Sequence, residues 1–261
     1  MREKPLPPGQ VEHDTFPRFG LMAFSHRYPD APDQLELVVK GDVASPFSLS
    51  GEELGKLYRE ERVADFHCVT TWSVRGVRWS GFLFRDFYEK FVEPRARPKP
   101  DARLVVLRCQ DGYSASLPLE DLLADDVLLA DRLDGRPLDM AHGAPLRLVA
   151  PAHYGFKNAK HLRGIEFWRD ARKYKFPGPR LMDHPRGRVA EQERAGGLPN
   201  WLARFLYRRL IGPVTSRFRK GLERYEADQR RAAEAEAARR AEEEAAAAAA
   251  AAAEDDGQLR L

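Results

Sequence analysis

The sequence predicts an α+β domain over residues 16–180, with a helical arm on its C-terminal side. Three observations favour this fold class. Short runs of β-branched and aromatic residues alternate with turn residues such as Gly, Asp and Pro. Short helix signals lie between these runs, without the regular strand–helix–strand rhythm of a parallel sheet. After residue 180 the composition becomes charged and then Ala-rich, which indicates a separate segment.

Strand signals recur along the whole predicted domain. They cover residues 34–40, 63–72, 77–80, 102–108, 114–117, 127–131, 145–150 and 161–169. Turns are predicted between them at residues 41–42, 75–76, 111–112 and 134–135, where Gly follows or precedes Asp or Arg. These signals predict strands interspersed with short helices, and they do not specify how the strands pair.

Three short helices are predicted inside the domain. The first runs from Gly51 to about Arg59, because Ser50 is a capping residue followed by two carboxylates in the first turn. The others cover residues 84–91, ended by Pro94, and residues 118–123.

The two ends of the chain differ from the domain. Residues 1–15 are expected to form a flexible lead, and residues 181–198 a linker. Residues 199–226 predict a basic amphipathic arm of two helices interrupted at Gly212–Pro213, with seven Lys or Arg and one acid between Trp201 and Tyr225. Residues 227–261 predict an Ala/Glu/Arg-rich tail, either an exposed helix or disordered.

Composition excludes several classes of protein. The net charge of +3 over 261 residues argues against a polyanion-coating protein, and 10% aromatic residues argue against a disordered chain. Only two cysteines, Cys68 and Cys109, exclude a disulfide framework. Residues 1–10 lack the apolar run of a secretory signal, and no charge-free run of about 18 apolar residues predicts a membrane span. A cytoplasmic location is therefore expected.

Three segments carry residues suited to chemistry. They are residues 65–72, 142–147 and 154–161. Arg147, Lys157 and Lys160, with Asn158 and His142, are able to converge on one phosphorylated anion. Each of the three segments also has a simpler interpretation. Cys68 would only fill the core, His142–Gly143 would be an ordinary turn, and Lys157 and Lys160 would lie on a solvated face.

Longer motifs distinguish these interpretations. Residues 66–73 (FHCVTTWS) and 77–81 (VRWSG) resemble the molybdenum-binding segment of the sulfite-oxidase-like molybdopterin oxidoreductases. The runs 111–118 (DGYSASLP), 142–147 (HGAPLR) and 155–162 (GFKNAKHL) resemble further segments of the same family, in the same order. The resemblance implies the mixed-sheet, sulfite-oxidase-type molybdopterin-binding domain, here with a C-terminal helical arm.

The resemblance also implies roles for individual residues. Cys68 would be the thiolate ligand of molybdenum in a molybdenum–molybdopterin cofactor. His142 and Arg147 would hold the pterin and its phosphate, and Asn158, Ala159 and Lys160 would add further contacts, with Lys157 a basic position of the motif. Tyr154 and Trp72 would line the substrate mouth, or else only pack around it. Phe16-Pro-Arg18-Phe19 would correspond to the first cofactor-contacting segment, and Cys109 would lie near the pocket or in the core.

The implied reaction is two-electron oxygen-atom transfer on a small sulfur- or nitrogen-oxide-type substrate. Electrons would pass through a separate electron-transfer protein, because two distant cysteines cannot hold a second cluster. The loop 69–73 lacks the arginines that sulfite oxidases place beside the metal cysteine, which argues against sulfite. The family's C-terminal dimerisation domain is not expected in residues 181–261, because this segment is too short and too helical.

Other interpretations stay open at this point. The domain could be a non-catalytic binding or scaffold protein on the same fold, although Cys68, His142, Arg147 and Lys160 together argue against it. Three surfaces are open to the arm at 199–226: an anionic membrane, a partner protein, or the domain itself. Docking on a membrane would place the protein at the inner face of that membrane. No motif for nucleic-acid binding accompanies its charge.

Overall fold

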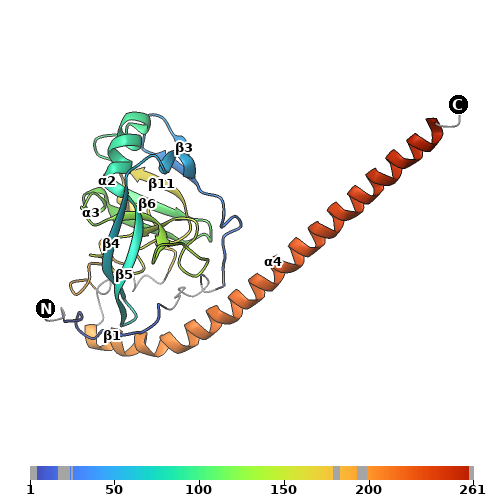
Figure 1. Ribbon diagram of the computed structural model, residues 1–261. Coiled ribbons are helices and arrows are strands. Elements are labelled where there is room, and N and C mark those ends of the chain that lie inside the picture. The colour runs from blue at the N-terminus through green and yellow to red at the C-terminus, as the bar shows by residue number, and fades with distance from the viewer. Residues whose placement is uncertain (1–4, 17–23, 25, 179–182, 193–198, 259–261) are drawn as a thin grey trace.

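The computed structural model describes residues 5–16, 24, 26–178, 183–192 and 199–258. Residues 17–19 of the predicted first cofactor-contacting segment lie outside this part of the chain. The described residues form two sheets with short helices beside them, and one long helix that extends away from the domain (Figure 1). The α+β fold class predicted from the sequence is confirmed.

One sheet has five strands in the described part of the chain. Its order is β3 (Phe47–Ser50), β2 (Glu36–Gly41), β11 (Leu162–Trp168), β6 (Leu104–Cys109) and β7 (Ser114–Pro118). The β2–β11 pair is parallel and the other pairs are antiparallel. The sheet is therefore mixed, as expected.

The second sheet has six strands among the described residues. Its main path is β1 (Val11–Glu12), β5 (Trp72–Leu83), β8 (Leu128–Leu133) and β10 (Arg147–Val149), with β4 (Arg59–Cys68) on β5 and β9 (Arg136–Pro137) on β8. The loop after β10 joins the sheets, because Leu148 donates its amide to Ala159 and Gln110 donates to His161. Lys160 lies between these two connections, so the loop is fixed from both sides.

The main core draws side chains from both sheets and from the short helices. It includes Leu37, Leu107, Leu129 and Phe167, all fully buried. The helices are α1 (Gly51–Leu54), α2 (Phe84–Phe87) with the π-helix η2 (Tyr88–Ala96), α3 (Leu119–Leu122) and the 3₁₀ helix η3 (Ala171–Lys173). Ser50 and Glu53 form a reciprocal capping box at α1, which confirms the predicted cap.

Two local predictions inside the domain are wrong. Residues 75–76 are not a turn but part of the continuous strand β5. The β4–β5 hairpin turns instead at Thr71, which has φ +74°, while Gly76, with φ +62°, lies opposite a register shift between Ala64 and Phe66. The helix predicted to end before Pro94 continues through it to Ala96, because its last two turns are wound as a π-helix.

The N-terminal lead is more ordered than predicted. Val11–Glu12 forms β1, parallel to Trp72–Ser73 of β5. The predicted linker also packs in part: Arg186 and Arg188 both approach the buried Asp121 carboxylate, and Arg188 pairs with His153 in an isolated bridge.

The arm is a single helix, α4 (Asn200–Gln258), with Pro213 inside it. The predicted interruption at residues 212–213 is therefore wrong. Gly212 and Pro213 both lie on the exposed side, where water can reach the carbonyl that the proline leaves without its helical donor. Among the described residues no helix is apolar over a length sufficient to cross a bilayer.

Candidate functional site

The tip of the β4–β5 hairpin holds Cys68. Its backbone pairs with Trp72, and its side chain is 6% exposed. The thiol lies 3.0 Å from the Thr70 hydroxyl. Burial raises the pKa of this thiol, against the hydrogen bonds of Thr70 and the charge of Lys160. A soft metal ion would favour the thiolate and reverse this preference.

Residues of the N-terminal segment hold this hairpin from outside. The Gln10 amide donates to the Cys68 carbonyl at 3.1 Å and accepts from the Ser73 hydroxyl at 3.1 Å. Ser73 also lies 2.8 Å from His67 Nδ1. The Val11 amide donates to Thr71 and the His13 amide to Ser73. The backbone of the cysteine loop is therefore fixed by contacts across about sixty residues of sequence.

Two buried polar atoms beside Cys68 have no hydrogen-bond partner within the described residues. They are the Thr71 hydroxyl and the Trp72 indole nitrogen. Buried polar groups are nearly always paired in folded proteins, so each such atom requires an explanation. A ligand with acceptor atoms beside the hairpin would supply the missing partners.

Arg147 is a buried cation with no carboxylate beside it in the described structure. The side chain is 2% exposed, lies over the Trp79 ring at 4.6 Å, and donates to the His142 carbonyl at 2.9 Å. Burial lowers the pKa of Arg147 to about 9. An unpaired charge in an apolar environment is costly, so this site suits a bound anion.

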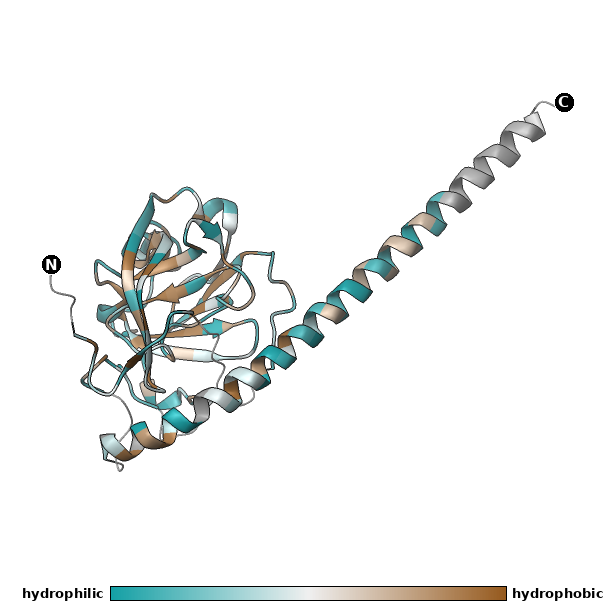
Figure 2. Ribbon diagram, turned by 60° about the horizontal axis from the view of Figure 1, so that its bottom comes forward, coloured by the Kyte–Doolittle hydropathy of each residue, from teal (hydrophilic) through white to brown (hydrophobic). Residues whose placement is uncertain are grey.

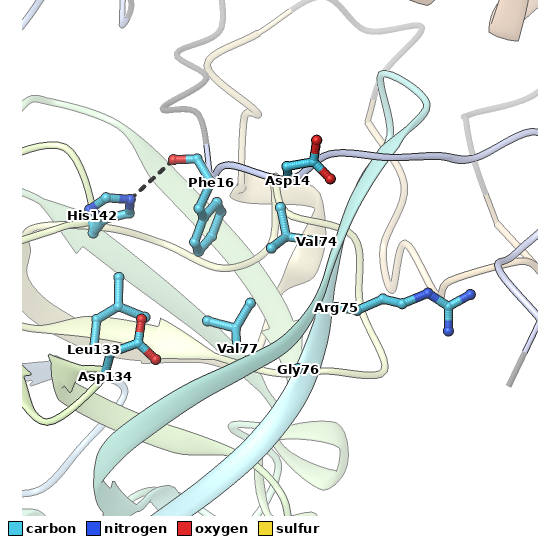
Figure 3. Close-up of a pocket in the computed structure, with 9 residues that line it drawn as sticks. All are labelled: Asp14, Phe16, Val74, Arg75, Gly76, Val77, Leu133, Asp134 and His142. Atoms are coloured by element: carbon cyan, nitrogen blue, oxygen red, sulfur yellow. Dashed lines mark hydrogen bonds between the residues drawn. The ribbon is translucent and has the colours of Figure 1, made fainter. Parts of the chain in front are cut away.

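His142 lies next to Arg147 at the same end of β10. Its Nδ1 is 2.7 Å from the Asp139 carboxylate, and its Nε2 is 3.2 Å from the Phe16 carbonyl (Figure 3). Burial alone would raise the pKa of Asp139, but the hydrogen bonds and charge of His142 lower it. Gly143 has φ +111°, and a Cβ there would lie 3.0 Å from Lys160, so glycine allows the two segments to approach.

A pocket of about 290 Å³ opens beside His142 and Phe16 (Figure 3). It is lined by Asp14, Phe16, Val74, Arg75, Gly76, Val77, Leu133, Asp134 and His142. The Arg75 side chain extends away from the pocket and pairs with Glu12. Cys68 and Arg147 do not line it, so the pocket touches the candidate site only through Phe16 and His142.

The structure does not bring all the predicted residues together. The Lys157 ammonium donates to the Ser116 carbonyl of β7 at 2.8 Å, and so it is directed to the five-stranded sheet. The Asn158 side chain accepts from the Ala150 amide and donates to the His153 and Tyr154 carbonyls. Ala159 has both backbone groups hydrogen-bonded, to Lys157 and Leu148. Asn158 and Ala159 therefore stabilise the loop that carries Lys160.

Tyr154 occupies a packed position. Its side chain is fully buried in a cluster with Val69 and Tyr207, and its hydroxyl accepts from the Ala190 amide at 3.1 Å. Trp72 is likewise buried, against Phe16 and Phe66. This arrangement favours the packing role over the substrate mouth for both residues. Cys109 belongs to the main core, where burial raises the pKa of its thiol well above the ordinary value.

Lys157 predicts a pH effect on stability. Burial lowers its pKa from 10.5 to about 8. In the unfolded chain Lys157 keeps its proton up to about pH 10.5. Burying the charged side chain therefore lowers the free energy of unfolding by about 3 kcal/mol below pH 8, and this loss disappears as the pH rises towards 10.5. In cofactor-free protein, the stability advantage of Lys157→Met over the wild type should therefore shrink by about 3 kcal/mol between pH 7 and pH 10.5. Denaturant unfolding at both pH values measures it, and an unchanged difference contradicts the buried charge.

These features fit a large anionic cofactor with a metal that accepts a thiolate. Arg147 and His142 would hold its phosphate and polar ring, and Cys68 would offer the sulfur ligand. Lys160 lies beside Gly143 of the same site. The unpartnered Thr71 and Trp72 atoms belong to the same hairpin tip as Cys68. Fold and site together indicate the class: a domain that binds a phosphorylated, metal-containing cofactor.

The chain belongs to the family of oxidoreductase molybdopterin-binding domains, whose sequence profile matches residues 25–176. Its cofactor is molybdenum–molybdopterin. The family and the cofactor implied by the motifs of residues 66–81 and 142–162 are both confirmed.

Several known proteins resemble the chain. An uncharacterized oxidoreductase, YuiH of Bacillus subtilis, is 38% identical over 63% of this chain and 80% of its own length. The protein-methionine-sulfoxide reductase catalytic subunit MsrP of Campylobacter jejuni is 32% identical over 52% of this chain and 49% of its own length. The chain thus spans about half the length of that reductase. The sulfane dehydrogenase SoxCD from Paracoccus pantotrophus gives a TM-score of 0.46 at 22% identity, over 53% of this chain and 39% of that one.

Sequence reasoning missed three contributors to the site. Gln10 holds the Cys68 backbone, Asp139 orients His142, and Tyr207 of α4 packs beside Val69. Gln10 and Tyr207 act across long sequence separations, and no local pattern indicates them. Asp139 lies three residues before His142, a spacing that does suggest a pair.

Proposed function

We propose that the protein is a molybdopterin oxidoreductase that reduces a neutral sulfoxide-type substrate. The observation that carries this proposal is the absence of cationic side chains from residues 69–73, beside the thiol expected to bind the metal. Of the nearest arginines, Arg75 pairs with Glu12 and Arg78 with Glu61. A sulfite dianion in a buried site requires paired charge, whereas a sulfoxide does not.

The relatives support the direction of this proposal. The MsrP proteins of Campylobacter jejuni and Xanthomonas campestris are named methionine-sulfoxide reductase catalytic subunits. Reduction would consume two electrons and two protons, and convert the sulfoxide to a thioether and water. When bound, the molybdenum group supplies the two-electron chemistry.

The protein residues would supply position and electrostatics. Cys68 would fix the metal at the hairpin tip, and Arg147 and His142 would hold the phosphorylated end of the cofactor. The Gln10 amide keeps the cysteine loop in place through the Cys68 carbonyl. The packed aromatic side chains of Phe16, Phe66 and Trp72 exclude water from this side of the site.

Electrons would come from a separate protein, because the two cysteines lie in different sheets and one of them is assigned to molybdenum. Both cysteines are free and buried, as expected in a reducing compartment. The cytoplasmic location stays a prediction.

The test begins with molybdenum per chain in protein from a host that makes molybdopterin. We expect a ratio near one. The loaded protein should reduce methyl phenyl sulfoxide with a reduced viologen dye as electron donor. It should oxidise sulfite with ferricyanide at least about 100-fold more slowly than it reduces the sulfoxide, since burying a dianion without a paired charge costs several kcal/mol. Loaded protein that oxidises sulfite and leaves sulfoxides intact would overturn the proposal.

A further inference from the structure

The beginning of α4 carries an apolar patch that faces solvent. Trp201, Phe205 and Leu206 are 69%, 50% and 47% exposed. They lie within the first two turns, and Figure 2 shows the hydrophobic colour at this end of the helix. Large apolar residues grouped on one surface indicate an interaction site more often than chance exposure does.

This patch is not the face that attaches the helix to the domain. Tyr207 and Phe218 are buried on the domain side. Tyr225 stacks on Tyr28 with ring centroids 4.7 Å apart, and Arg208 donates to the Gly9 carbonyl. At 100° per residue, Trp201 and Phe205 point to the side opposite Tyr207 and Tyr225. The helix is thus already seated, and the patch remains on its outer side.

Positive charge surrounds the patch and continues along the same helix. Seven basic residues and one acid lie between Trp201 and Tyr225. The exposed cations are Arg208, Arg209, Arg217, Arg219, Lys220 and Arg224. The Arg209 guanidinium lies 4.1 Å from the centre of the Phe205 ring, so charge and apolar surface are in direct contact.

The rest of α4 has the opposite character. Residues 227–258 contain nine acids and four arginines, and they extend away from the domain (Figure 1). An anionic surface would attract only the first part of the helix and would repel the second. Attraction to anions is therefore localised where the apolar side chains are exposed.

We propose that residues 201–225 of α4 dock on an anionic lipid surface, with Trp201, Phe205 and Leu206 inserted among the headgroups. The three apolar side chains project from the outer side of the helix among exposed cations, an arrangement that suits insertion among anionic headgroups. Trp, Phe and Leu beside Arg and Lys on a seated helix match the composition of interfacial helices. Each cation near the surface adds to the attraction.

The test uses the full chain and vesicles of phosphatidylglycerol and phosphatidylcholine. We expect cosedimentation at low salt, at least about 10-fold weaker partition into vesicles of phosphatidylcholine alone, and release at high salt. Replacing Trp201, Phe205 and Leu206 together by Ala should lower partition at least about 10-fold, because the buried apolar area is lost. Changing Arg217, Arg219 and Lys220 to Glu should abolish binding at low salt.

A matched control is available on the domain. Tyr58 and Val63 are 71% and 65% exposed near β4, so Tyr58→Ala with Val63→Ala removes comparable exposed apolar area elsewhere. This control should bind vesicles like the wild type. Circular dichroism and the Tm show whether each variant keeps its fold.

Fluorescence supplies an independent measurement. Trp72 and Trp79 are 1% exposed and Trp168 is half-buried, so Trp201 is the tryptophan that brominated lipid should quench. Trp201→Phe should remove most of this quenching.

No binding to anionic vesicles at low salt would overturn the proposal. Equal partition of wild type and the triple Ala variant would also overturn it, as would tighter binding to polyglutamate than to vesicles, which would indicate an acidic protein partner.

Discussion

Cys68→Ala is expected to abolish turnover of the loaded protein and to lower its molybdenum content. The Cys68 thiol is the proposed sulfur donor at the hairpin tip, and Ala offers no ligand atom in its place. Removing a residue that only supports a metal ligand lowers metal affinity or activity about 10–100-fold, so removing the ligand itself should lower them by more. Viologen-linked sulfoxide reduction and elemental analysis measure the two effects, and electron paramagnetic resonance should lose the signal of the thiolate-bound metal.

The chain provides a matched control for this variant. Cys109 is equally buried but belongs to the main core, so Cys109→Ala removes the same thiol without removing the ligand. This control should keep its molybdenum and most of its activity. Full activity in Cys68→Ala would rule out the assigned role of Cys68.

Arg147→Met is expected to change stability in opposite directions with and without the cofactor. In the cofactor-free protein, burial lowers the pKa of Arg147 to about 9, which corresponds to a penalty of about 4–5 kcal/mol for keeping the charge. Losing the donor to the His142 carbonyl costs roughly 1–3 kcal/mol in return. Losing the contacts of the guanidinium with the Trp79 and Phe66 rings reduces the gain further, so the Tm should rise by a few degrees at most.

The same substitution should weaken cofactor binding. Removing one partner of a buried charge pair costs about 2–5 kcal/mol of affinity, so molybdopterin occupancy and the cofactor-dependent rise in Tm should both fall. Arg163→Met is the control, because it removes an exposed arginine of β11 that lies outside the candidate site. A less stable cofactor-free Arg147→Met, or one that binds the cofactor like the wild type, would contradict this account of the site.

Most elements of the fold follow from local sequence, because turn residues and strand periodicity act over a few residues. The exceptions are instructive. Arg75–Gly76 has the composition of a turn, but the longer β4–β5 pairing overrides it and accommodates the positive φ of Gly76 as a bulge. Pro213 predicts a break in α4, but the helix continues through it. Tyr207 and Phe218, on either side of the proline, are buried against the domain, and their packing offsets the free-energy cost of one proline on an exposed face.

Candidate site residues can be named from the sequence where the expected chemistry depends on residue type, and their roles stay predictions. Cys68, His142 and Arg147 are recognisable from their motifs, and the structure gives His142 and Arg147 a shared environment. Side-chain direction was not predictable: Lys157 turns towards the Ser116 carbonyl of a distant strand, and Asn158 turns back towards backbone groups of the preceding loop. The same limit hides Gln10, whose partner Cys68 is 58 residues away.

The long exposed section of α4 has a hydrodynamic consequence. About 33 residues beyond Tyr225 at about 1.5 Å each give a rod of roughly 50 Å, which is about three times the radius of gyration of a domain of about 200 residues. Such a rod raises the frictional coefficient without adding much mass. A monomer should therefore elute from a size-exclusion column at the volume of a larger globular protein, and its mass should be determined by light scattering.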